Sequence, residues 1–322
     1  MSTITPMTLS EIFDRLFKLI GKTWTRNLAV ASIILIVPSI LLMLGWNIFF
    51  SNLADVIETD AMSGQSLTEN IFSIIGSMSF LFVDLLIFFI GTVAATLSVT
   101  TIGCAEINGE RLSIGEALSR TFGIRLVRLI GQLILQGLAL GASVLIPYAL
   151  IIVAVGAESL LLGLVAGLLL AASILLVIYL AVGWAFTVPV IGWEDARIIQ
   201  SFARSWELVK GNWWRVFGIL VLLSMLASFA ISLLTTPVSL VVMWDFFISY
   251  FKMLGSIGSD QSNIDLSMTL ELMKSLGFGI GFMNALTTIL QMLVNPLYIV
   301  VLYFDLRARK ELHSQPLTVV PQ

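Results

Sequence analysis

Lysine and arginine are confined to a few short segments of this 322-residue chain. Fifteen of the 17 basic residues fall in four clusters, at 15–26, 111–128, 197–215 and 307–310. Nearly everything between the clusters is apolar or carries acidic charges alone. Cytoplasmic loops of membrane proteins have an excess of Lys and Arg, because moving these residues across the bilayer is disfavoured. The clusters therefore predict a protein that crosses a membrane several times, with both termini in the cytoplasm.

The composition also indicates a membrane protein. The chain is 58% hydrophobic and 11% charged, whereas about 25% of the residues of a soluble domain are charged. A bilayer core about 30 Å thick requires about 20 apolar residues per helix. Six stretches reach this length, at about 28–50, 79–104, 129–155, 160–192, 216–243 and 276–304. We expect an all-α, polytopic membrane protein with six transmembrane helices, formed by one membrane domain over residues 1–322 with a cytoplasmic tail at 307–322.

Three segments of the sequence resemble one another. Residues 8–17 match residues 113–122 in their key positions, and residues 200–206 keep the order of Glu or Gln, then Arg, then an aromatic residue. Each segment continues through further basic residues into an apolar span that contains a proline. The pattern predicts three parallel repeats, each an interfacial amphipathic helix followed by a two-helix hairpin. The expected repeats span about 7–105, 111–193 and 194–306.

The three similar segments have features of helices that lie in a membrane interface. In the first segment, apolar residues recur at helical spacing and basic residues flank them. Thr8 with Glu11, and Ser113 with Glu116, follow the S/T-x-x-E pattern of a capping box. A short helix with one apolar face and basic flanks, placed just before a span, is expected to lie in the cytoplasmic interface.

A resemblance to a known family rests on residues 9–20, 202–216 and 302–311. These stretches resemble the integral membrane domain that precedes the catalytic barrel in some bacterial glycerophosphodiester phosphodiesterases and that also occurs alone. The resemblance spans nearly the whole chain, and the ending Leu302-Tyr-Phe-Asp-Leu-Arg-Ala-Arg309 is its most specific motif. The enzymes add a soluble barrel with paired histidines and metal-binding carboxylates. This chain has one histidine, His313, so we expect the phosphodiesterase chemistry to be absent.

Charged residues at the predicted cytoplasmic face form the first candidate site. One acid follows each returning helix, and one arginine has an equivalent place in each amphipathic segment. Ion pairs among them would lock neighbouring repeats together in a ring. The alternative is a site for an anionic lipid headgroup, for which basic pockets between helices are the usual chemistry. The residues are Arg15, Arg120, Arg204, Glu106, Glu194 and Asp305.

Polar side chains within the spans form the second candidate set. Asp84 interrupts an apolar run, and ionisable residues inside spans are costly and are usually functional or paired. Its place near the expected outer interface favours a solvated or capping role over a substrate or proton role. Amide side chains in spans more often join helices by hydrogen bonds than bind a solute. The amides are Gln132, Gln136, Asn284, Gln291 and Asn295.

The sequence contains no phosphate loop, zinc-ligand spacing, nucleophile elbow or nucleotide fingerprint. We therefore expect no catalytic residue, metal or cofactor, and no nucleic acid as a partner. The preferred interpretation is a non-catalytic module of a bacterial inner membrane that organises anionic lipid or a partner membrane protein. The alternative is a transporter or channel for a lipid-like or small amphiphilic solute, because prolines in spans free backbone carbonyls that can line a cavity. An intramembrane enzyme is the third interpretation.

Overall fold

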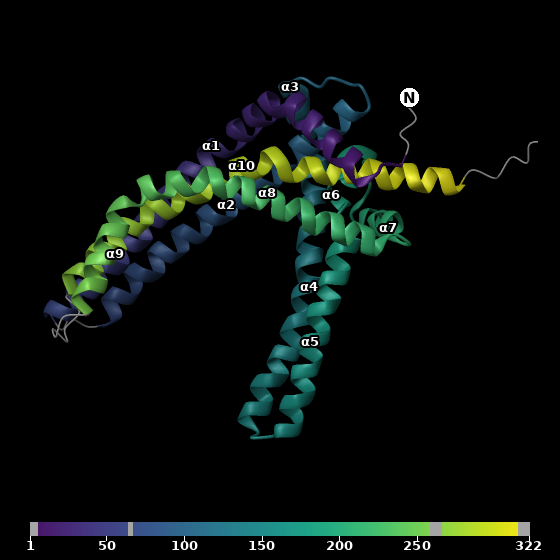
Figure 1. The fold of residues 1–322 in the computed structure, drawn as a ribbon. Coiled ribbons are helices and arrows are strands. Elements are labelled where there is room, and N and C mark those ends of the chain that lie inside the picture. Colours follow the sequence, from purple (N-terminus) through teal and green to yellow (C-terminus); the bar gives the residue numbers. More distant parts are fainter. Residues whose placement is uncertain (1–5, 64–66, 258–265, 315–322) are drawn as a thin grey trace, which may run out of the picture. The chain divides into compact units, whose positions relative to one another are not determined.

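The computed structural model describes residues 6–63, 67–257 and 266–314 of the chain (Figure 1). Side chains are described for residues 6–58, 71–255 and 269–311. Within the described ranges the chain is helical and contains no strand, which confirms the all-α fold class. The helices are α1 (Leu9–Ser63), α2 (Leu67–Ile107), α3 (Ile114–Thr121), α4 (Ile124–Gly156), α5 (Leu160–Gly183), α6 (Thr187–Glu194), α7 (Ile198–Val209), α8 (Trp213–Val242), α9 (Trp244–Ile257) and α10 (Leu266–Ser314).

Six helical segments of the described chain are long and apolar enough to cross a membrane. They are Leu9–Glu58, Ile71–Ile107, Ile124–Gly156, Leu160–Glu194, Trp213–Val242 and Thr269–Glu311. Each of the six spans expected from the sequence falls on one of these segments. The protein is therefore a multi-pass membrane protein, as predicted.

The amphipathic segments take two different forms. α3 and α7 are separate short helices, as predicted, whereas residues 9–26 continue without a break into the span that follows in α1. Gly211 separates α7 from α8 with a φ of 89°, a backbone conformation that glycine adopts without strain. Gly21, at a similar distance after the first segment, stays helical. The first copy therefore differs from the expected unit, and the threefold repeat remains a prediction.

The chain, expected to form one membrane domain, divides into two compact units. Unit 1 comprises Met1–Arg26, Thr96–Ser224 and Asn295–Gln322. Unit 2 comprises Asn27–Ala95 and Met225–Val294. The long helices α1, α2, α8 and α10 each contribute residues to both units.

The core of unit 1 surrounds the final turns of α10. Tyr303 and Phe304 are buried there with Phe186 and Leu208. Gly103 of α2 faces Leu297 of α10, and a Cβ on this glycine would lie 2.9 Å from the leucine side chain. α4 and α5 form a hairpin within the same unit (Figure 1). Most apolar side chains of this hairpin are exposed in the isolated chain, as expected where lipid covers them.

Unit 2 is held together by close packing of small residues. A Cβ added to Gly277 or Gly281 of α10 would lie 2.6 Å from the Cα of Asn47 or Met43, respectively, in α1. Two glycines at four-residue spacing let the backbones of neighbouring transmembrane helices approach each other. α1 and α10 therefore pack closely in this unit because α10 has no side chains at these two positions.

Candidate functional site

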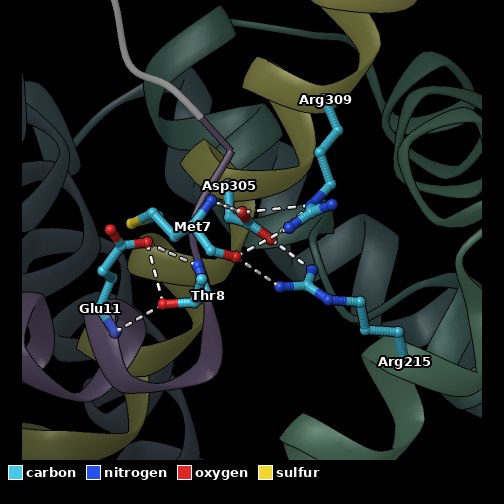
Figure 2. A network of polar contacts seen from close by, with 6 residues as sticks. All are labelled: Met7, Thr8, Glu11, Arg215, Asp305 and Arg309. Atoms are coloured by element: carbon cyan, nitrogen blue, oxygen red, sulfur yellow. Dashed lines mark hydrogen bonds and ion pairs between the residues drawn. The ribbon is translucent and has the colours of Figure 1, made fainter.

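Asp305 lies at the centre of a polar network in unit 1 (Figure 2). Its Oδ1 accepts a hydrogen bond of 2.7 Å from the backbone N–H of Met7, and its Oδ2 lies 2.5 Å from Nη1 of Arg215. Nε of Arg309 donates to the same Oδ2 at 3.1 Å. The Asp305 side chain is fully buried, so its charge depends on these two guanidinium groups for compensation.

The same network includes the start of α1. The carbonyl oxygen of Met7 accepts hydrogen bonds from Arg215 at 2.9 Å and from Arg309 at 2.8 Å. The backbone N–H of Thr8 donates to Glu11 Oε2 at 2.6 Å, and the N–H of Glu11 donates to Thr8 Oγ1 at 3.4 Å, which confirms the first capping box. The network thereby connects the residues just before α1 and its first turn, the first turn of α8 and the last turns of α10.

Glu194 forms a second polar centre of unit 1, at the end of α6. The hydroxyl of Tyr303 donates a hydrogen bond of 2.5 Å to Glu194 Oε1, and Nε of Arg204 donates to Oε2 at 3.2 Å. Arg204 also donates to Glu207 at 2.9 Å. The pairing of Arg204 with Glu194 is one that the predicted ring of ion pairs contained.

Glu106, the third acid of the predicted ring, pairs with Arg26. The two side chains approach to 2.5 Å, and Arg26 also donates to the carbonyl of Leu112 at 3.1 Å. Neither Arg15 nor Arg120 takes part in an ion pair among the described side chains, and Arg120 is exposed. The expected ring is therefore corrected: its acids are neutralised mainly by arginines that the sequence comparison between repeats did not select.

A pocket of about 160 Å³ lies beside Glu106 in unit 1. It is lined by Arg15, Lys18, Leu19 and Lys22 of α1 and by Glu106 and Ile107 of α2. Arg26 already neutralises Glu106, and Lys18 forms a 2.7 Å ion pair with Asp14. Within the described part of the chain, Arg15 and Lys22 have no acidic partner within 4 Å. The pocket therefore carries net positive charge, and guanidinium and ammonium groups there can donate charge-assisted hydrogen bonds to phosphate oxygens.

A further acidic centre, Asp195, was not selected from the sequence. Its Oδ1 accepts hydrogen bonds from Arg125 at 3.1 Å and from Arg128 at 3.0 Å, and its carbonyl accepts a second bond from Arg128. Asp195 has a left-handed backbone, with φ of 56°, and ends α6. Arg125 and Arg128, in the first turns of α4, thus fasten this helix to the end of α6. The sequence does contain a signal for this second acid, because Asp195 lies next to Glu194 between two apolar segments.

A protein-family model matches residues 15–306, and its description is "Domain of unknown function (DUF7847)". The chain belongs to this family. The matched region contains Arg15, Glu106, Glu194 and Asp305, whereas Met7 and Arg309 of the Asp305 network lie outside it. No curated protein and no solved structure matches the chain. The resemblance to the membrane domain of glycerophosphodiester phosphodiesterases remains a prediction.

Three of the amide residues in the spans form hydrogen bonds within their own helices. Gln132 donates to Gln136 at 2.6 Å along α4, and Asn284 donates to the carbonyl of Ile280 at 3.0 Å along α10. The expectation that the amides of the spans join different helices stays a prediction. Gln132 is buried and its Oε1 has no hydrogen-bond partner. The two remaining amides, Gln291 and Asn295, are half-buried in α10.

Asp84 of α2 is buried inside unit 2, with 2% of its surface exposed. Its Oδ2 has no hydrogen-bond partner and lies against Gly45 of α1. The expected solvated or capping role is therefore wrong. The sequence places Asp84 along its own helix, but its burial depends on how closely α1 approaches at Gly45.

Proposed function

We propose that this protein is a non-catalytic module of a bacterial inner membrane that holds anionic lipid at the basic ends of its spans, with both termini in the cytoplasm. The orientation rests on the excess of Lys and Arg at one end of every span. The observation that carries the lipid proposal is the positively charged pocket beside Glu106. It combines cationic side chains from α1 with the end of α2.

The charge of the pocket supports an anionic ligand. Arg15 and Lys22 face it without an acidic partner among the described side chains, while Arg26 neutralises its one carboxylate at 2.5 Å. A phosphate would supply the missing negative charge and accept hydrogen bonds from both cations. Basic pockets between helices on the cytoplasmic side bind headgroups of this kind.

Aromatic residues at the start of α8 support the assignment of this end of unit 1 to the membrane interface. Trp213 donates from Nε1 to the carbonyl of Tyr179 at 3.2 Å and stacks on Phe217, with ring centroids 5.2 Å apart. These rings line an apolar groove of about 560 Å³ together with Trp214. Trp and Tyr gather at the headgroup level because one end of the ring system is apolar and the other is polar.

Native mass spectrometry of the protein in mild detergent, with an anionic phospholipid titrated in, tests the proposal. The double variant Arg15→Gln/Lys22→Gln is expected to weaken lipid binding about 30-fold, since each basic residue contributes about 1 kcal/mol near an anionic surface. Arg120→Gln is the matched control, because Arg120 has the equivalent place in the second predicted repeat but does not line the pocket. Unchanged lipid binding in the double variant would contradict the proposal.

A second candidate is a transporter for a lipid-like or small amphiphilic solute. One observation favours it: Asp84 is a buried carboxyl inside a span, and such residues mark substrate or proton pathways. Reconstitution into vesicles separates the two candidates. Solute or lipid movement that depends on Asp84 supports transport, whereas lipid binding that depends on Arg15 and Lys22 without any movement supports the module.

A further inference from the structure

The carboxyl group of Asp84 occupies a space that a glycine leaves open. A Cβ added to Gly45 of α1 would overlap Asp84 Oδ2 and would lie 3.3 Å from the side chain of Leu81. Asp84 is 2% exposed, and its Oδ2 receives no hydrogen bond. The carboxyl group is therefore enclosed where α1 and α2 pack together at Gly45.

The basic side chains described in unit 2 do not neutralise Asp84. Lys274 lies 2.8 Å from Asp55 and 3.7 Å from Glu58, and Lys252 is exposed. The charged side chains described in this unit are Asp55, Glu58, Asp84, Asp245, Lys252, Glu271 and Lys274. The unit thus has more acids than bases, and its one buried acid has no ion pair among the described side chains.

An ionised carboxylate in this environment would be strongly disfavoured. Burying a charge without a partner costs several kcal/mol, and Asp84 is 2% exposed. A divalent cation would need several oxygen ligands, with six to eight for calcium, and the described residues contain no group of three or more His, Cys, Asp or Glu side chains that could hold a metal ion. A proton removes the charge and needs no further ligand.

We propose that Asp84 is a proton-binding site that keeps its proton while α1 and α2 are packed at Gly45. When the two helices separate there, the O–H bond breaks, the proton passes to water and the carboxylate becomes hydrated. Pro38 supports such a movement, because it lies in α1 before Gly45 and removes one backbone hydrogen bond of the helix. Protonation of Asp84 and the packing of α1 against α2 are therefore coupled.

Infrared difference spectroscopy of the full chain in lipid nanodiscs tests the protonation directly. At pH 7 the wild type is expected to show the carbonyl band of a protonated carboxyl group, and Asp84→Asn is expected to lose that band. Asp84→Leu provides a second variant that suits the apolar surroundings if the asparagine variant expresses poorly. A wild-type spectrum without a band that either substitution removes would overturn the proposal.

Thermal unfolding as a function of pH tests the coupling. The wild type is expected to lose stability as the pH rises, because the unfolded chain releases the Asp84 proton while the packed state retains it. In Asp84→Asn this loss is expected to be absent. The exposed acid Asp245 of the same unit provides the control, and Asp245→Asn should keep the wild-type pH dependence. The same pH dependence in wild type and Asp84→Asn would contradict the coupling.

Discussion

The Oδ1 atom of Asp305 lies 2.7 Å from the backbone nitrogen of Met7, although 298 positions separate the two residues in the sequence. This contact places the beginning of α1 beside the end of α10 in unit 1, and Arg215 adds the start of α8. Asp305 is fully buried. Its carboxylate also binds Arg215 and Arg309 at this end of the unit.

Removal of the Asp305 charge should destabilise the protein strongly. Asp305→Asn keeps the shape of the side chain but removes the negative charge that pairs with Arg215 and Arg309. Breaking a buried ion pair in this way costs about 3–5 kcal/mol. Thermal unfolding in detergent measures the loss. Glu311→Gln removes the exposed partner of Arg307 and should cost less than about 1 kcal/mol, so equal losses in the two variants would contradict the assignment.

The close packing of α10 on α1 in unit 2 should depend on Gly277 and Gly281. An alanine at either position would bring a Cβ to 2.6 Å from a backbone Cα of α1. Because backbone cannot move away as a flexible side chain can, we expect a loss of about 1–3 kcal/mol in the free energy of unfolding. Gly141→Ala is the control, since a Cβ there meets nothing within 4 Å. It should be neutral or stabilising, because alanine favours helix.

The Asp84–Gly45 contact should be visible as an energetic coupling. Gly45→Ala alone should destabilise the protein, because its Cβ requires the space of the Asp84 carboxyl group. In an Asp84→Ala background the same substitution should cost less, with a coupling of about 0.5–3 kcal/mol for residues in contact. A double-mutant cycle measured by thermal unfolding gives this value. Strictly additive effects would show that the two residues do not share the space.

The capping box of α3 should stabilise this helix in a pH-dependent way. Hydrogen bonds from the backbone N–H and hydroxyl of Ser113 hold the pKa of Glu116 below its usual value. The stabilisation is therefore present above the ordinary glutamate pKa and is lost as the pH falls through the lowered one. Hydrogen exchange of the α3 amides, compared between wild type and Glu116→Gln, measures it. The difference should be present at pH 7 and should disappear in acid.

Local signals predicted the spans and the helix starts well. The six spans follow from apolar length, and the capping boxes at Thr8 and Ser113 involve residues three positions apart. The same local signals did not predict which arginine pairs with which acid at the basic ends of the spans. Arg15 and Arg26 are 11 positions apart, so they share one helix face but differ by about 16 Å in height. The periodicity of the sequence identifies the face of α1 that carries both arginines. The position along α1 that Glu106 contacts depends instead on how α2 packs against α1.

The sequence by itself determined that this chain is an all-helical membrane protein with six spans, because hydrophobic length and helix capping act over short distances along the chain. Only the tertiary structure decided that Arg26 neutralises Glu106, that Met7 and Arg215 bind Asp305, and that Gly45 encloses Asp84. Each of these contacts joins segments far apart in the sequence. Their geometry depends on how closely the helices pack and at what relative height, which no local pattern encodes.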